Sequence, residues 1–144
     1  MATFTKINDF VEAVAEKIHN LGADTLTVAL SNTAPASETN DPTADGNGIL
    51  ANVTEIAYTN LSSRVITTIS SAQTSGTYKL DLTDLVLTAS GGSVATFRYI
   101  YIYNSTPVTN NLIGYYDYGS AVTLADTETF TINFDNTNGF ITLA

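Results

Sequence analysis

The residue types that most often perform catalysis are scarce in this chain, and their spacing assembles no catalytic group. There is one histidine, His19, and there is no cysteine. A Ser-His-Asp triad needs the histidine within reach of a serine and an acid, and no nucleophile-elbow motif places one. The close acidic pairs are Asp81 with Asp84 and Asp126 with Glu128. Because such pairs are common in turns, we expect a protein that is not an enzyme.

Residues 41–48 are the best candidate for an ion site. Asp41 opens an alternation of oxygen-bearing side chains, and Gly46 stands at the sixth position, as in the first half of a calcium loop. The twelfth position is Asn52, where such a loop needs a bidentate Glu. We therefore expect a solvated loop, and the sequence indicates no metal and no cofactor.

Residues 97–103 form the most unusual segment, because both of its faces are largely apolar. Strand alternation places Phe97, Tyr99, Tyr101 and Tyr103 on one face and Arg98, Ile100 and Ile102 on the other. One interpretation is a central strand covered on both sides. The other is a protein-binding face, which Tyr115, Tyr116 and Tyr118 of the next strand would enlarge, or a platform on which sugars stack.

An amphipathic helix is predicted over about residues 5–20. Its apolar residues recur at three- and four-residue steps: Ile7, Phe10, Val11, Val14, Ile18 and Leu21. Thr5 can cap its start and Gly22 can end it. His19 is expected near the C-terminal end of this helix, as a cation that contacts exposed carbonyl groups.

After Gly22 the apolar period shortens to two, which predicts strands. Leu26, Val28 and Leu30 alternate with smaller or polar residues, so the first strand should have one buried face. A long loop is expected over residues 32–48, and residues 49–58 are ambiguous. Further strands are predicted at 64–70, 77–82, 85–89, 94–103, 112–118, 129–135 and 140–143. Hairpin turns are predicted at 90–93 and 136–139, and a longer connection begins at 104–107.

These elements predict one domain over residues 1–144, with a helix at about 5–20 and a β domain at about 25–144. Short strands with no helices between them favour a mainly β fold, an antiparallel β-sandwich or a jelly-roll-like fold. The N-terminal amphipathic helix should cover one end or face of it.

The charge balance excludes two classes of partner. Fourteen acidic and five basic residues give a formal charge of −9. This charge repels phosphate backbones and anionic lipid, so nucleic acid and membrane are not expected as partners. No apolar run approaches the length of a membrane span.

Two stretches of the chain resemble small structural proteins of tailed-bacteriophage virions. They are residues 10–35, which include Phe10-Val11-Glu12 and Ala29-Leu30-Ser31-Asn32, and residues 71–120, which include Phe97-Arg98-Tyr99 and Tyr115-Tyr116-Asp117-Tyr118. Within that group the chain is similar to capsid decoration or cement proteins. The resemblance implies a β-rich molecule that is made in the bacterial host cytoplasm and binds the outside of the head in many copies. Its partner would be the major capsid protein, without a small-molecule substrate or catalytic residues.

A protein of this kind needs exposed apolar surface for docking, and we expect a homo-oligomer, a dimer or a trimer. The candidate interface residues are Phe4, Phe10, Val14, Tyr99, Tyr101, Tyr103, Tyr115, Tyr116 and Tyr118. Residues 1–4 or the apolar helix stripe are expected to contribute to subunit contacts. The alternative function is a head or tail fibre component, or a receptor- or carbohydrate-binding module in which exposed tyrosines stack on sugars.

Overall fold

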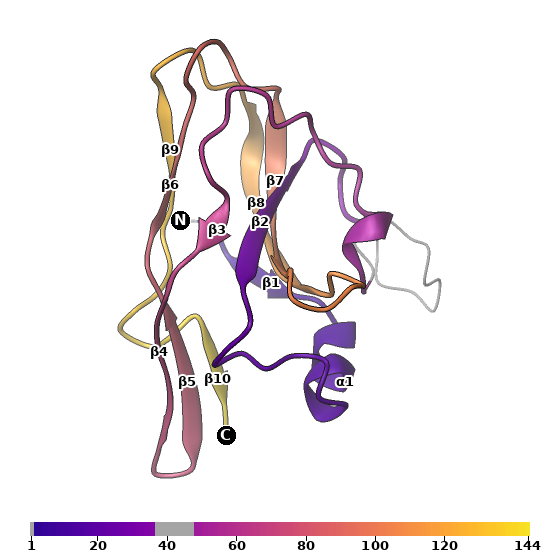
Figure 1. The fold of residues 1–144 in the computed structure, drawn as a ribbon, viewed down its shortest axis with the longest axis vertical. Helices are drawn as coiled ribbons and strands as arrows, with labels where there is room; N and C mark the ends of the chain where they lie inside the picture. Colours follow the sequence, from indigo (N-terminus) through magenta and orange to yellow (C-terminus); the bar gives the residue numbers. More distant parts are fainter. Residues whose placement is uncertain (1, 37–47) are drawn as a thin grey trace.

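The computed structural model describes residues 2–36 and 48–144, and strands dominate it (Figure 1). The larger sheet has five strands in the order β1-β8-β7-β2-β3, and all neighbours are antiparallel. Its strands are β1 (Phe4–Lys6), β8 (Leu112–Val122), β7 (Phe97–Asn104), β2 (Leu26–Ser31) and β3 (Val65–Ile66). The predicted mainly β, antiparallel fold with one helix near the N-terminus is confirmed.

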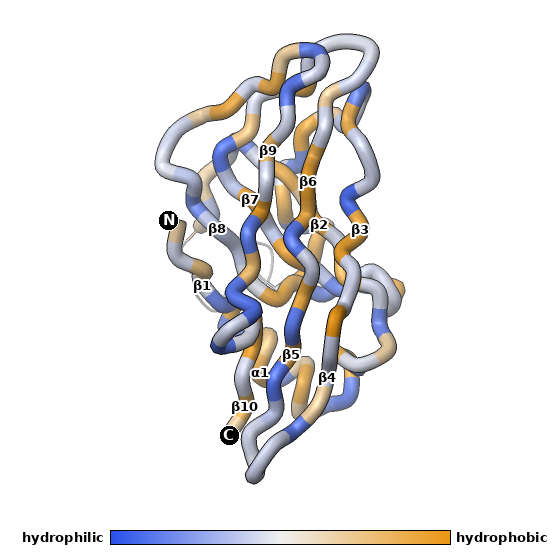
Figure 2. The backbone as a smooth tube through the Cα atoms, turned by 90° about the vertical axis from the view of Figure 1, so that its left-hand side faces the viewer, coloured by the Kyte–Doolittle hydropathy of each residue, from blue (hydrophilic) through white to orange (hydrophobic). Residues whose placement is uncertain are grey.

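A second layer consists of two small antiparallel sheets. One has the order β10-β5-β4, with β10 (Ile141–Leu143), β5 (Thr77–Leu82) and β4 (Thr68–Thr74), and the other pairs β6 (Leu85–Thr88) with β9 (Thr129–Ile132). Figure 2 looks onto this layer, with β6 and β9 above β4 and β5. The two small sheets run into each other, because backbone hydrogen bonds continue between them. Ser62 N donates to Thr88 O, and Thr83 N donates to Thr67 O. The two small sheets therefore form one continuous layer.

The main core lies between the two layers. The larger sheet contributes Leu30, Ile100 and Ile102, and the second layer contributes Leu82 and Leu87, all buried in one cluster. Removing these apolar side chains from water is the main force that holds the layers together. The result is a sandwich-like arrangement.

The strand β2 corrects the prediction of a single buried face. All six of its residues are buried, because β2 lies between β7 and β3 and both of its faces are covered. Leu26, Val28 and Leu30 face the main core, whereas Ala29 packs in a second cluster with Val53. The second face of β2 carries small or polar side chains, Thr27, Ala29 and Ser31, which are buried as well.

The second cluster covers the outer face of the larger sheet. It contains Tyr99, Tyr101 and Tyr103 of β7, with Ile7, Ala29, Val53 and Leu112. Its cover is the segment around η1 (Leu50–Asn52), within the stretch that the sequence leaves ambiguous. Of the two interpretations of residues 97–103, the central strand is the one that the fold adopts.

Alternation fails at one position of β7. Phe97 pairs with Val122 but Tyr99 pairs with Asp117, so the register shifts between them. One residue of β7 lies there opposite four residues of β8, and this bulge in β8 interrupts the regular pairing that keeps alternate side chains on one face. Phe97 therefore packs in the main core, and only the three tyrosines share the outer face.

The helix is shorter than predicted. Helix α1 spans Asp9–Ala15, seven residues, instead of about 5–20. Residues at its predicted start form β1, which pairs with β8, so Asn8 rather than Thr5 is the N-cap. At the other end Lys17 adopts a φ of 65°, which ends the helix well before Gly22. Phe10 is buried, but Val11 is 56% exposed and Ile18 is 36% exposed.

Two predicted hairpin turns are connections between sheets. Residues 90–93 lead from β6 to β7, and residues 136–139 lead from β9 to β10, and neither pair of strands is adjacent. Gly91 and Gly139 do adopt the positive φ expected of them, 82° and 92°. The connection that begins at residues 104–107 joins the antiparallel neighbours β7 and β8, as predicted.

Beyond Thr27 the edge of β2 has no partner in β3, and side chains bond to its backbone instead. Leu30 N donates to Tyr58 Oη at 3.0 Å, and Tyr58 Oη donates to Glu55. Arg64 donates to Val28 O, and its guanidinium carbon lies 3.6 Å from the centroid of the Tyr58 ring. These bonds satisfy backbone groups that a longer β3 would otherwise pair.

Replacing Tyr58 by phenylalanine should lower the free energy of unfolding by about 1–3 kcal/mol, because the buried Leu30 N–H loses its acceptor. Urea unfolding followed by circular dichroism measures this change. The matched control is Tyr118→Phe, at a ring that is 49% exposed, where a change within about 0.5 kcal/mol is expected. Equal effects of the two substitutions would contradict the assignment.

Candidate docking groove

His19 lies in the interior and not on the surface. It is 7% exposed, its ring centroid is 5.2 Å from that of Phe10, and its Nδ1 lies 3.1 Å from Asn104 Nδ2. Asn104 Nδ2 also donates to Asp24 Oδ2 at 2.5 Å. Burial lowers the pKa of His19, while the charge of Asp24 acts in the opposite direction. The expected cation at exposed helix carbonyls is therefore replaced by a packed imidazole whose pKa favours the neutral form.

The lowered pKa of His19 predicts a loss of stability in mild acid. The unfolded chain takes up a proton at His19 near pH 6.5, whereas the folded chain does so only at lower pH. Stability should be greatest above about pH 6.5 and fall as the pH drops from there toward the folded pKa. Urea midpoints measured across this range should fall in the wild type and fall less in His19→Gln. Asp117 and Asp135, whose pKa values are also lowered, act in a separate, more acidic window.

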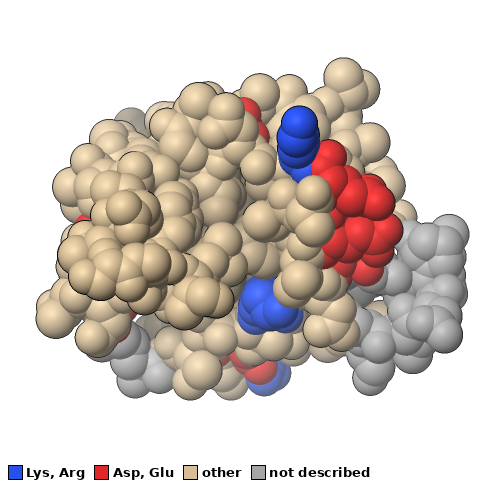
Figure 3. All heavy atoms as spheres, turned by 90° about the horizontal axis from the view of Figure 1, so that it is seen from below, with Lys and Arg blue, Asp and Glu red and all other residues tan. Residues whose placement is uncertain are grey.

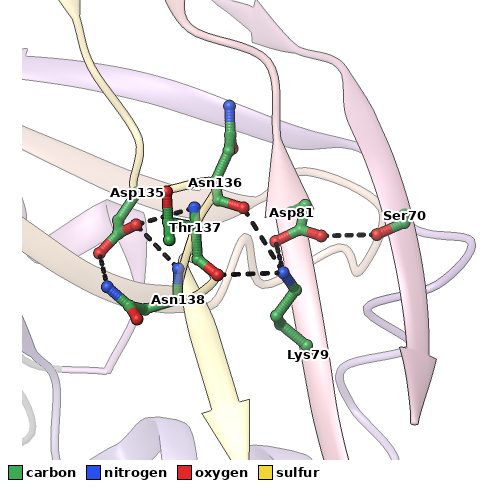
Figure 4. A network of polar contacts seen from close by, with 7 residues as sticks. All are labelled: Ser70, Lys79, Asp81, Asp135, Asn136, Thr137 and Asn138. Carbon is green, nitrogen blue, oxygen red and sulfur yellow. Dashed lines mark hydrogen bonds and ion pairs between the residues drawn. The ribbon is translucent and has the colours of Figure 1, made fainter. Parts of the chain in front are cut away.

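Each acid of the two candidate pairs is held in a structural contact. Asp81 is 8% exposed; its Oδ2 accepts from Ser70 Oγ at 2.8 Å and its Oδ1 lies 3.3 Å from Lys79 Nζ (Figure 4). Asp84 accepts from Phe134 N and Asn133 Nδ2. Asp126 accepts from the backbone of residues 91–92, and Glu128 from Ala125 N. These carboxylates hold turns and strand ends together.

Metal ligands do not gather in the part of the chain that the structure describes. Over residues 2–36 and 48–144, no three His, Asp or Glu side chains come together to hold an ion. The candidate calcium loop from Asp41 onward lies outside the described residues, except for Gly48.

Several of the candidate interface residues are buried in the interior of the chain. The exposed fractions of Phe10, Tyr99, Tyr101 and Tyr103 are 1%, 7%, 0% and 7%. Val14 packs against the main core and is partly buried. Burial within the chain leaves the first four no surface to offer to a partner.

The remaining candidates divide between two faces. Tyr115 packs on the outer cluster, with its ring centroid 5.6 Å from that of Tyr101. Phe4 and Tyr116 lie at the side of the sandwich where β1 and β8 face the second layer, which we call the open side. Their ring centroids are 5.1 Å apart. Phe4 also reaches Phe140 of the second layer at 4.7 Å. The strand β1 thus closes one part of this open side.

Beyond Phe4 the layers leave a groove of about 170 Å³ between β8 and β9. Its lining is largely aromatic and aliphatic: Ala2, Ile100, Tyr116, Tyr118, Phe130, Thr131, Ile132 and Asn133. Tyr118 is half exposed, and its ring meets that of Phe130 at 5.2 Å and 72°. The groove brings Tyr116 and Tyr118, two of the predicted interface residues, together with residues of β9 that the sequence did not single out.

A bulge in β8 positions Tyr118. Between Asp117, which pairs with Tyr99, and Val122, the residues of β8 have no partner in β7. Asp117 accepts from Arg98 Nε at 2.7 Å and Nη2 at 2.8 Å, and from Gly119 N at 2.8 Å. Gly119 has a φ of 92°, a conformation that glycine adopts without strain. The ion pair and the glycine fix the loop that presents Tyr118 to the groove.

The groove is suited to contact and not to acid–base chemistry. Among the described residues of its lining none carries a charge. Burial and the nearby Asp135 raise the pKa of Tyr116 to about 12, so its phenol stays neutral. A half-open apolar surface of this kind is typical of interaction sites.

The sequence pattern held only part of the information needed to assign the β9 residues to the groove. Phe130 and Ile132 alternate with threonines in a stretch that the sequence predicts as a strand. Alternation identifies the apolar face of a strand, but the strand that it meets depends on the packing of the two layers. Only the fold places these residues opposite Tyr118.

Comparisons with protein-family models, with curated proteins and with solved structures found no match to this chain. No helix in the described part of the chain has the length and apolar character needed to cross a membrane.

Proposed function

We propose that this protein is a non-enzymatic structural protein of a tailed-phage virion, and specifically a capsid decoration protein. It binds the outside of the head and bridges neighbouring subunits of the major capsid protein. The resemblance of residues 10–35 and 71–120 to virion proteins suggests this role. The observation that carries it is the aromatic groove on the open side of the sandwich.

The groove supplies the surface that such a protein needs. Apolar side chains around Tyr118 and Phe130 remain accessible between the two layers. Covering them with a partner removes apolar area from water, at roughly 25 cal/mol per Å². Tyrosine at such a position also offers a large contact area with few rotatable bonds.

The distribution of acidic residues supports solubility of the free protein before assembly. Seen from below in Figure 3, acidic side chains gather on the side where α1 lies. Helix α1 contributes Asp9 and Glu12, both exposed. Together with the net charge of −9, these residues make free copies repel one another. A decoration protein must stay dissolved until it meets an assembled shell.

Particle composition tests the proposal. Particles from the source culture are sedimented on a density gradient, and the copy number of this protein is measured against the major capsid protein by mass spectrometry. We expect a number comparable to that of the capsid protein, on full heads. A few copies per particle would favour the fibre alternative, and absence from particles would contradict a virion role.

A single substitution tests the surface. Tyr118→Ala should weaken binding to purified heads, because it removes half-exposed aromatic area from the groove. Val108→Ala is the control, since Val108 is fully exposed in the connection between β7 and β8. Equal binding by both variants would remove the groove from the interface, and a hit for the wild type on a glycan array would favour the carbohydrate-binding alternative.

A further inference from the structure

Among the residues that the structure describes, β6 is the only strand that pairs with β9, so β9 has an open edge along the groove. Ala89 N donates to Glu128 O and Thr127 N donates to Ala89 O, so Ala89 turns its backbone groups toward the chain that becomes β9. Backbone direction alternates along a strand, and Leu87 and Leu85 therefore bond to Phe130 and Ile132. By the same alternation, Thr129 and Thr131 turn their N–H and C=O groups away from β6.

The opposite wall of the groove is also an unfinished edge. The strand β1 pairs with β8 only at residues 114–116. Tyr116, at the end of this pairing, and Tyr118 beyond it form the wall, with Ile100 beside them and Thr131 and Asn133 across from them. An extended chain in this groove would meet apolar side chains on one side and the hydrogen-bonding groups of β9 on the other. This arrangement is the one used in β-strand addition.

Charge around the groove selects the partner. Among the described residues near the groove, Arg98 is paired with Asp117 and Lys79 is paired with Asp81. Two other carboxylates lie there: Asp84, which accepts from Asn133 of the lining, and Asp135, which accepts from Thr137 and Asn138 and whose pKa the charge of Lys79 also lowers. Asp135 also acts electrostatically on Tyr116 in the groove. The rim is thus negative, which favours a basic segment and disfavours a second copy of this acidic chain.

We propose that an extended segment of a partner protein, apolar at alternate positions and flanked by lysine or arginine, adds to β9 as a strand and fills the groove. The identification of this partner as the capsid protein rests on the proposed function above. The Thr129 and Thr131 backbone groups bind the main chain of the segment, Tyr118 and Phe130 receive its apolar side chains, and Asp84 and Asp135 attract its basic residues.

Proline at position 131 tests strand addition. Thr131→Pro removes the outward N–H, and proline is accepted in edge strands whose N–H is not used within the sheet. Thr131→Val keeps the N–H and is the matched control. Both variants should unfold at similar urea concentrations. Thr131→Pro should bind heads at least about tenfold more weakly than the wild type, and Thr131→Val within about twofold. Head binding that Thr131→Pro leaves unchanged would overturn the proposal.

A second measurement does not depend on the phage assignment. Amide hydrogen exchange of the wild-type protein is followed with a synthetic peptide of alternating valine and threonine that has lysine at both ends. We expect slower exchange at the Thr129 and Thr131 amides, and no change with the same peptide flanked by glutamate. No slowing with the lysine peptide overturns strand addition, as does dimerisation through these amides without peptide. Failure of the wild type to bind heads, with the amides protected by peptide, overturns the proposed function alone.

Discussion

Phe97→Ala should lower the free energy of unfolding by about 3–5 kcal/mol, because it removes a fully buried ring from the main core. The ring of Phe97 lies 5.3 Å from that of Phe130 at 86°, an edge-to-face contact between the two layers. Alanine would leave a cavity where β7 meets β9, and rigid neighbours on both sides limit collapse into it. Urea unfolding of the purified variant measures the loss.

The control for Phe97 is Val108→Ala, at a side chain that is 100% exposed, where a change within about 0.5 kcal/mol is expected. NMR chemical shifts locate the disturbance. They should move at Leu87 and Phe130 of the main core and much less at Val53 of the outer cluster. Shifts concentrated at Val53 would contradict the bulge, because they would place Phe97 on the face of the tyrosines.

Strands whose signals are local were predictable from sequence. Residues 77–82 are both predicted and observed as β5, since alternating residues there are bounded by turn-forming ones. For β2, the sequence predicted the burial of only one of its two faces. Leu26, Val28 and Leu30 show the face toward the main core, but the burial of Thr27 and Ala29 comes from η1 and β3, which lie far along the chain.

The N-terminal helix shows how distant pairing overrides a local pattern. The apolar stripe continues from Ile7 to Leu21, and both of these residues are buried. Neither belongs to α1, because Ile7 N donates to Ile113 O beside β1 and Lys17 has already left helical geometry. Apolar residues at every third or fourth position indicate which side chains face the core. Segments outside a helix can place those side chains in the core as well.

The candidate site was predictable only in part, because tyrosine serves both cores and interfaces. Tyr101 and Tyr118 look alike in sequence, yet one is fully buried and the other is 49% exposed. The difference is the bulge that Asp117 and Arg98 hold in β8. A bulge depends on the pairing of two strands, and sequence alternation does not reveal it.

Gly114→Ala should detach β1 from β8 and cost about 3 kcal/mol, as overpacked sites do. A Cβ at position 114 would lie 2.3 Å from Phe4 Cζ and 2.5 Å from Thr5 O. The ring of Phe4 could rotate away, but the backbone oxygen of Thr5 moves only if the strand moves. The amide of Ile7, which donates to Ile113 O, should then exchange faster with solvent. Hydrogen exchange of residues 4–7 and urea unfolding measure the two effects.

Two further variants separate this clash from general effects of adding a methyl group or losing a ring. Gly76→Ala meets nothing within 4 Å and should cost only the strain of its φ of +85°, about 1 kcal/mol. Phe4→Ala removes the ring contacts of Phe4 with Tyr116 and Phe140 without displacing Thr5, so it should destabilise the chain while β1 stays paired.

If β1 borders the docking surface, Gly114→Ala should also weaken binding to heads, because Ala2 at the end of the groove moves with the strand. Slow exchange at residues 4–7 in Gly114→Ala would show that β8 yields instead of β1, and head binding should then be unchanged.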